Sequence, residues 1–152
     1  MPIGKTSNIE LLARKVLLFV LPENTPNYNV RPDWLKNPKT KKNLELDIYY
    51  PELFLGIEVN SIFHRRGSQS ARDKVKNWRC YDRGIILLRV WNKQELLKLP
   101  RVIYEYVSKN FYHTKVIKEI PEWLTNEVKS YEPNLRAFNS TKLKLPKKKR
   151  RK

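Results

Sequence analysis

The stretch Leu44-Glu45-Leu46-Asp47-Ile48-Tyr49-Tyr50 alternates apolar and polar side chains, as a half-buried β-strand does. After the turn Pro51-Glu52-Leu53-Phe54, the segment Leu55-Gly56-Ile57-Glu58-Val59-Asn60 alternates again. Two such strands joined by a short turn predict a β-hairpin. If Tyr50 pairs with Leu55, Asp47 lies directly opposite Glu58. Both side chains then lie on one face of the sheet, with Cβ atoms about 5 Å apart.

The residues after the hairpin predict a strand–helix–strand unit. Residues 85–91 form a nearly continuous apolar run, which is typical of a buried strand. A helix is expected over residues 71–83, with Gly84 at the position where helices commonly end. This order of elements joins parallel strands by a crossover connection. The core is therefore predicted to be α/β, with a mixed sheet and one crossover helix.

Further helices are expected before and after this core. Ser7-Asn8-Ile9-Glu10 reads as a capping box that begins a helix through the apolar residues 11–20. Prolines break up residues 21–43, which predicts an irregular loop with basic flanks. Asn92-Lys93-Gln94-Glu95 resembles a second capping box, and Pro100 should interrupt or kink the helix that follows before it resumes over 101–109.

The pattern weakens from about residue 111, where Pro121 is expected to open a short helix over 123–128. Residues 142–152 carry eight basic side chains and read as a tail rather than a folded element. We therefore divide the chain into an α/β domain (1–110), a C-terminal extension (111–141) and a basic tail (142–152).

The charge of the chain predicts a polyanionic partner. The 152 residues include 32 Lys and Arg against 15 Asp and Glu, a formal net charge of +17. Residues 1–110 hold 20 basic and 11 acidic side chains (net +9), and residues 111–152 hold 12 and 4 (net +8). A localisation signal in the tail alone therefore cannot account for the charge. Basic chains bind nucleic acid by releasing the counterions condensed on its phosphates.

Membrane binding is not expected, because no apolar run approaches the roughly 20 residues of a membrane span and no basic amphipathic helix is evident. Val16 to Val20 is too short for such a span and lacks a cleavage site after it. Cys80 is the only cysteine, which excludes an internal disulfide and a thiolate metal cage. An intracellular location is expected, nuclear or organellar in a eukaryote and cytoplasmic in a bacterium or phage.

The carboxylate pair of the hairpin is the main candidate for chemistry. Asp47 and Glu58 facing each other on paired strands repel, and a divalent cation with a preference for carboxylate oxygens resolves the repulsion. The alternative is that both lie on a solvated sheet face. Three further residues favour a site: His64 just after the second strand, Asp73 at the start of the crossover helix, and Lys76 one turn later. Taken singly, each has an ordinary structural explanation.

The hairpin segments, Phe63-His64, Arg72-Asp73-Lys74-Val75-Lys76, Cys80 and residues 84–90 together resemble the core of PD-(D/E)XK nucleases. The nearest branch contains very-short-patch repair endonucleases and related phage or homing endonucleases. The resemblance covers about residues 7–110. It implies a restriction-endonuclease-like, three-layer core with helices on both faces of a mixed sheet.

The resemblance also implies roles for individual residues. Asp47 would be the central metal ligand, helped by Glu58 or Asp73, and the cofactor would be Mg²⁺ or Mn²⁺. Glu10 matches an acidic position near the site, although the capping box also explains it. His64 would act as general acid or base. The residues expected to contact the phosphate backbone are Arg65, Arg66, Arg72 and Lys76, with Lys147, Lys148, Lys149, Arg150, Arg151 and Lys152 in the tail.

One departure leaves two functions open. Asn60 occupies the position of the family's lysine, two residues after the glutamate, so either His64 or Lys76 replaces that lysine or the site is impaired. The first function is a magnesium-dependent endodeoxyribonuclease, a hydrolase of phosphodiester bonds. The second is a non-catalytic nucleic-acid-binding protein, such as a component of a ribosome or another ribonucleoprotein that contacts rRNA. DNA is preferred as the partner over RNA, and a homodimer is left open.

Overall fold

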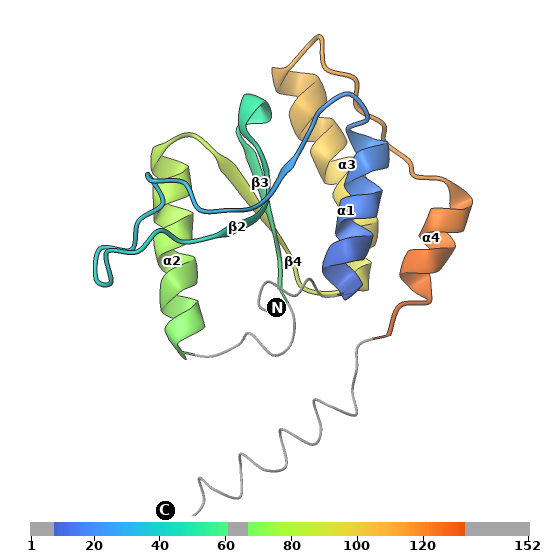
Figure 1. Cartoon of the computed structure of the whole chain (residues 1–152). Coiled ribbons are helices and arrows are strands. Elements are labelled where there is room, and N and C mark those ends of the chain that lie inside the picture. Colours follow the sequence, from blue (N-terminus) through green and yellow to red (C-terminus); the bar gives the residue numbers. More distant parts are fainter. Residues whose placement is uncertain (1–7, 61–66, 133–152) are drawn as a thin grey trace, which may run out of the picture.

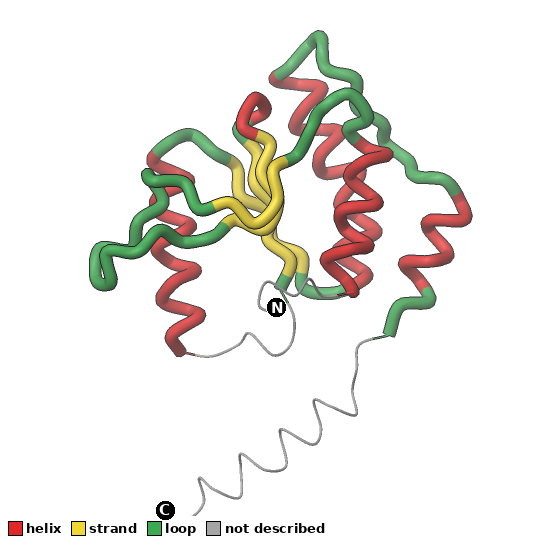
Figure 2. The backbone as a smooth tube through the Cα atoms, in the orientation of Figure 1, coloured by secondary structure: helices red, strands yellow, loops and turns green. Residues whose placement is uncertain are grey.

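A computed structural model of the chain describes residues 8–60 and 67–132, and the side chains of residues 67–70 are left out of the description. A four-stranded mixed sheet lies at its centre, with the strands in the order β1-β2-β3-β4 (Figures 1 and 2). The strands are β1 (Asn27–Val30), β2 (Leu46–Tyr50), β3 (Leu55–Val59) and β4 (Ile86–Val90). The predicted α/β class is confirmed at this level.

The hairpin formed by β2 and β3 has the predicted register. Tyr50 pairs with Leu55 and Ile48 pairs with Ile57 in antiparallel orientation, and Asp47 and Glu58 are the next residues along the two strands. The turn is a short 3₁₀ segment, η1 (Pro51–Leu53), which ends at Phe54 with a left-handed φ of 51°.

The crossover connection is also confirmed, because β3 and β4 pair in parallel and α2 (Gly67–Asp82) connects them. The helix begins four residues earlier than the sequence pattern indicated. Gly84 follows it with a φ of 73°, a conformation that residues other than glycine rarely adopt.

Helices cover both faces of the sheet. Helix α2 lies on one face, and α1 (Asn8–Val20) and α3 (Lys93–Asn110) lie together on the other (Figure 1). The larger core cluster joins α1 and α3 to the sheet through Ile48, Tyr50, Leu55, Ile57 and Val59. A smaller cluster on the α2 face includes Leu46, Cys80 and Ile85. Helix α4 (Glu122–Lys129) packs beside α3 and contributes Leu124 and Val128 to the larger core.

Two local expectations were wrong. Residues 21–43 are not entirely irregular, because β1 pairs with β2 along the edge of the sheet. Helix α3 is not interrupted at Pro100 but runs from Lys93 to Asn110, which leaves a kink as the predicted alternative. A proline removes one backbone hydrogen bond of the helix, and Pro100 itself is buried. The predicted cap of α3 is confirmed, since the Asn92 side chain accepts a hydrogen bond from the Glu95 backbone N–H at 2.9 Å.

Candidate functional site

Asp47 and Glu58 hold each other through the backbone of the opposite strand. The Asp47 backbone N–H donates to Glu58 Oε2 at 3.0 Å, and the Val59 backbone N–H donates to Asp47 Oδ2 at 2.8 Å. The two carboxylates therefore lie close together where the pairing of β2 and β3 ends. Glu58 faces α2, because the side chains that alternate with it along β3 pack in the α1 and α3 core.

Lys76 of α2 completes a buried ion pair with Glu58. The distance from Lys76 Nζ to Glu58 Oε1 is 2.7 Å, and only 9% and 3% of the two side chains are exposed. A buried charge is tolerated only when it is paired and hydrogen-bonded, and both conditions hold here. The Lys76 ammonium thus reaches the carboxylate pair from a neighbouring helix rather than from β3.

The pKa of the Asp47 carboxyl is raised above its ordinary value. Its burial, and next the charge of Glu58, raise the pKa of the Asp47 carboxyl to about 8. Lys76 opposes this rise without cancelling it. At neutral pH, and without a cation beside it, Asp47 is therefore predominantly protonated.

Asn60 adds a side-chain oxygen that accepts no hydrogen bond within the described part of the chain. It follows Glu58 by two residues, so the alternation of β3 brings its side chain to the same face. Asn60 is 2% exposed, and its Oδ1 atom is buried without a hydrogen-bond partner. Buried carbonyl oxygens almost always have a partner, so this atom requires an explanation.

Asp47, Glu58, Asn60 and Lys76 line one pocket of about 200 Å³. Arg31, Glu45 and Arg72 also line it. Arg31 Nη2 is 2.9 Å from Glu45 Oε1, so the wall from β1 and β2 carries its own ion pair. Arg72 precedes Lys76 by one turn of α2, and both therefore belong to the wall that the helix provides.

The donor set fits a hard divalent cation of low protein coordination. Asp47 and Asn60 supply oxygens that lack full internal partners, and Glu58 lies beside them. Over residues 8–60 and 67–132, no three His, Cys, Asp or Glu side chains gather into a metal-binding group. Mg²⁺ in proteins typically uses one or two carboxylates and keeps several waters, which this pocket has room for.

Two predicted site residues lie outside the pocket. Asp73 was expected near the carboxylate pair as a metal ligand, but it does not line the pocket. Its Oδ1 lies 3.3 Å from Arg89 Nη1 of β4, the residue that pairs with Glu58 in the sheet. Glu10 of α1 is buried and bonds Arg14 at 3.1 Å. Its charge contributes to the raised pKa of Asp47, although Glu10 does not line the pocket.

The remaining predicted site residues lie outside the described ranges. These are His64, Arg65 and Arg66, together with the tail residues Lys147, Lys148, Lys149, Arg150, Arg151 and Lys152.

Sequence reasoning missed three residues of the pocket. Asn60 was read only as the loss of a lysine, although the same alternation that placed Glu58 also places Asn60. Arg31 was hidden because β1 was not recognised. Glu45 was quoted within the strand pattern, but its partner Arg31 could not be inferred from that pattern.

Comparisons with known proteins found two viral relatives. The chain is 35% identical over 77 residues to uncharacterized protein 033L of Invertebrate iridescent virus 3, covering 43% of this chain and 40% of the relative. It is 37% identical over 82 residues to uncharacterized protein 307L of Invertebrate iridescent virus 6, covering 43% and 42%. The chain thus matches about two fifths of the length of these relatives. No family model and no solved structure matches it.

No helix in the described ranges has the length and apolar character needed to cross a membrane.

Proposed function

We propose that this chain is a metal-dependent endonuclease that hydrolyses phosphodiester bonds in DNA. The observation that carries the proposal is the set of half-buried Asp47 and buried Glu58 and Lys76, which lines one pocket at the hairpin. Buried charged groups contribute little to stability, because an uncharged core of similar volume is often equally stable or more stable, and a functional role is a reason to retain them.

The arrangement supports the resemblance to PD-(D/E)XK nucleases. A hairpin carries the two carboxylates, and one crossover helix then leads to a parallel strand, as the resemblance implies. The family's lysine position is occupied by Asn60, and the Lys76 ammonium lies 2.7 Å from Glu58 instead. Of the two replacements that the sequence left open, Lys76 thus has direct geometric support, because His64 lies outside the described residues.

Under this proposal, each side chain of the pocket has its own role. Asp47 and Asn60 would hold Mg²⁺ or Mn²⁺, with Glu58 beside them and Lys76 orienting Glu58. When bound, such a cation stabilises charge on a phosphoryl oxygen and lowers the pKa of a water molecule. Arg72 on the pocket wall is placed to attract a phosphate. His64 remains the candidate for general acid–base chemistry, and the basic tail remains a candidate for binding the DNA backbone.

Asn60 is also the observation that favours a second function. A nuclease fold that has lost its lysine can persist as a binding module, in a ribonucleoprotein for example. Such a module would bind nucleic acid through its basic surface and need no divalent cation. It would also tolerate the loss of Asp47 without a change in function.

The test is cleavage of supercoiled plasmid DNA by the full chain, with Mg²⁺, with Mn²⁺ and with EDTA. We expect nicking that depends on the metal and that Asp47→Asn abolishes, while DNA affinity stays within a few-fold. Asp82→Asn is the matched control, because Asp82 is an exposed residue of α2 outside the pocket. Asp73→Asn should retain activity, since Asp73 does not line the pocket.

Absence of cleavage with either metal, together with full nucleic-acid binding, would support the non-catalytic alternative. Equal cleavage by the Asp47→Asn variant and the parent would remove Asp47 from the mechanism. If His64 is the acid or base, His64→Ala should slow cleavage by roughly 10²-fold or more.

A further inference from the structure

Residues 36–42, here named the lysine loop, form an ordered turn between β1 and β2. The Asn37 backbone N–H donates to the Lys42 carbonyl at 2.9 Å, and the Lys41 N–H donates to the Asn37 carbonyl at 2.8 Å. The Asn37 side chain accepts a further bond from the Lys39 N–H at 3.0 Å. Lys41 adopts a left-handed φ of 64°. The loop is thus held in one shape by its own hydrogen bonds.

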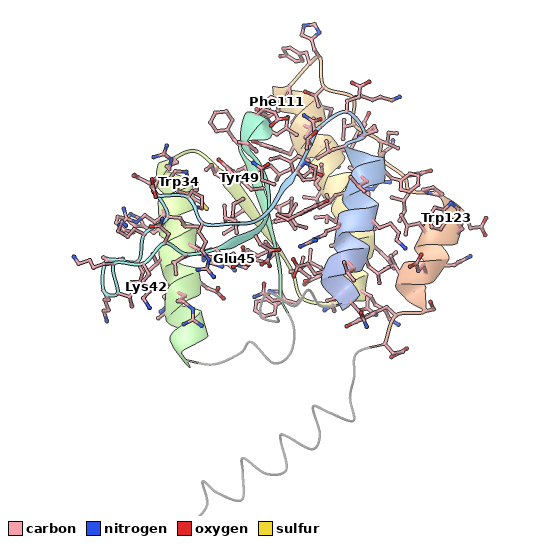
Figure 3. All side chains as sticks on the ribbon, in the orientation of Figure 1. Trp34, Lys42, Glu45, Tyr49, Phe111 and Trp123 are labelled. Atoms are coloured by element: carbon pink, nitrogen blue, oxygen red, sulfur yellow. The ribbon has the colours of Figure 1, made fainter. Side chains whose placement is uncertain are left out.

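The lysine loop concentrates positive charge on this shape. It contains Lys36, Lys39, Lys41 and Lys42, all exposed, and no acidic residue. Lys36 Nζ donates to the Asn43 side chain at 3.1 Å. Within the described ranges, no carboxylate lies at ion-pair distance from Lys39, Lys41 or Lys42. Three ammonium groups are therefore presented together to solvent, and Lys42 lies at the outer edge of the molecule in Figure 3.

The loop is fixed to the same part of the molecule as the pocket. Arg79 of α2 donates to the Lys36 carbonyl at 3.2 Å, and the Arg83 guanidinium lies 4.9 Å from the centre of the Trp34 ring. Leu35 packs in the smaller core cluster on the α2 face. The chain on either side of the loop supplies Arg31 and Glu45 to the pocket wall. The lysine loop and the pocket are therefore attached to the same part of the fold, where α2 packs against the sheet.

We propose that the lysine loop binds the phosphate backbone of duplex DNA and positions the duplex against the pocket of Asp47 and Glu58. The inference rests on the proposed function for its purpose, but the binding itself does not require catalysis. The one exposed apolar side chain of the loop is Pro38, which offers no large aliphatic or aromatic group for insertion into a lipid surface. Lysines are point charges that bind phosphates without reading sequence, so the loop supplies affinity and orientation.

The experiment measures binding of a fluorescent 20-base-pair DNA duplex to the full chain in EDTA over a range of salt concentrations. The test variant replaces Lys39, Lys41 and Lys42 by glutamine. The control variant makes the same change at Lys98, Lys115 and Lys129, which are exposed residues of α3, of the chain after it and of α4. Both variants lose three charges and keep the basic tail, so net charge and tail affect them equally.

We expect weaker binding by the loop variant, with a slope of log K against log salt that is shallower by about 2 to 3, since each phosphate contact contributes about 0.9. The control variant should keep a slope close to that of the parent. An equal effect of the two triple variants would mean that only net charge matters, and this would overturn the inference. A larger effect of the loop variant on an RNA duplex or on a polyglutamate peptide than on DNA would also overturn it, since the partner would then be of another class.

Asn37→Ala tests the ordered shape without removing charge. It deletes the side-chain bond to Lys39, so affinity should fall several-fold while the salt slope stays unchanged. Thermal unfolding of every variant shows whether the fold is kept. Loop dependence without any plasmid cleavage would leave the inference standing and contradict the nuclease. Plasmid cleavage together with DNA binding that does not depend on the loop would overturn the inference and leave the nuclease proposal standing.

Discussion

Replacing Asp47 by asparagine should remove a pH dependence of stability that the pocket imposes on the parent chain. Burial, and next Glu58, raise the pKa of Asp47 from an ordinary 3.8 to about 8 in the folded protein. The folded state then holds a proton that the unfolded state has released. This contribution to stability is fully present below pH 4 and is lost as the pH rises through 8.

The magnitude follows from one proton. Each pH unit in the window changes the free energy of unfolding by about 1.4 kcal/mol, so the parent should lose about 2 kcal/mol between pH 6 and pH 8 from this group. Asparagine has the size of aspartate, keeps an oxygen for the Val59 N–H, and does not titrate. The free energy of unfolding of the variant should therefore vary less with pH. Relative to the parent, the variant should be more stable at pH 8 than at pH 6.

The assay is urea unfolding in EDTA at several pH values, followed by tryptophan fluorescence. Asp82→Asn serves as the control, because its exposed side chain should leave the parent's pH dependence unchanged. The difference between variant and parent cancels the titration of every group that the two proteins share. Parallel stability profiles for the Asp47→Asn variant and the parent would refute the reasoning, because Asp47 would then ionise as an ordinary exposed carboxyl.

Two further predictions concern the same pocket. Lys76→Met should lower the free energy of unfolding by about 3 to 5 kcal/mol, because it leaves Glu58 buried and unpaired. Adding Glu58→Gln to this variant should recover part of the loss. If the losses of the two single variants simply add in the double variant, the two side chains are not directly coupled. Mg²⁺ should raise the melting temperature more at pH 8 than at pH 6, since it competes with the proton on Asp47, and the shift should be absent in the Asp47→Asn variant and smaller in Asn60→Ala. An equal Mg²⁺ shift in all three proteins would place the ion elsewhere.

The hairpin could be predicted from sequence because its two signals agree. The period-2 alternation fixes which side chains share a face, and the four residues from Pro51 to Phe54 fix the pairing of Tyr50 with Leu55. The position of Asp47 opposite Glu58 follows from these two facts alone. The same reasoning gave the crossover helix and its end at Gly84.

The parts that were missed depend on tertiary contacts. Strand β1 is a short edge strand between prolines, and only its pairing with β2 defines it. Helix α3 continues through Pro100, which is buried in the folded chain, and local helix propensity does not reveal this. The partners of individual charges also escaped the sequence. Whether Lys76 or Asp73 turns toward Glu58 depends on how α2 is rotated against the sheet.

The pocket is lined by three basic and three acidic side chains whereas the surface is strongly basic, and this contrast constrains how a phosphate can approach. The chain carries a net charge of +17, so its surface attracts polyanions, yet two carboxylates lie at the pocket. A phosphate that enters the pocket would lie near Glu58 and Asp47. Lys76 neutralises the charge of Glu58, and a proton or a cation neutralises that of Asp47. Under the proposed function, the pocket therefore accepts a phosphodiester most readily in two states, with Asp47 protonated or with Asp47 bound to a metal ion. A basic surface alone would bind DNA without either state, so dependence of binding at the pocket on both pH and Mg²⁺ distinguishes a nuclease site from a merely basic scaffold.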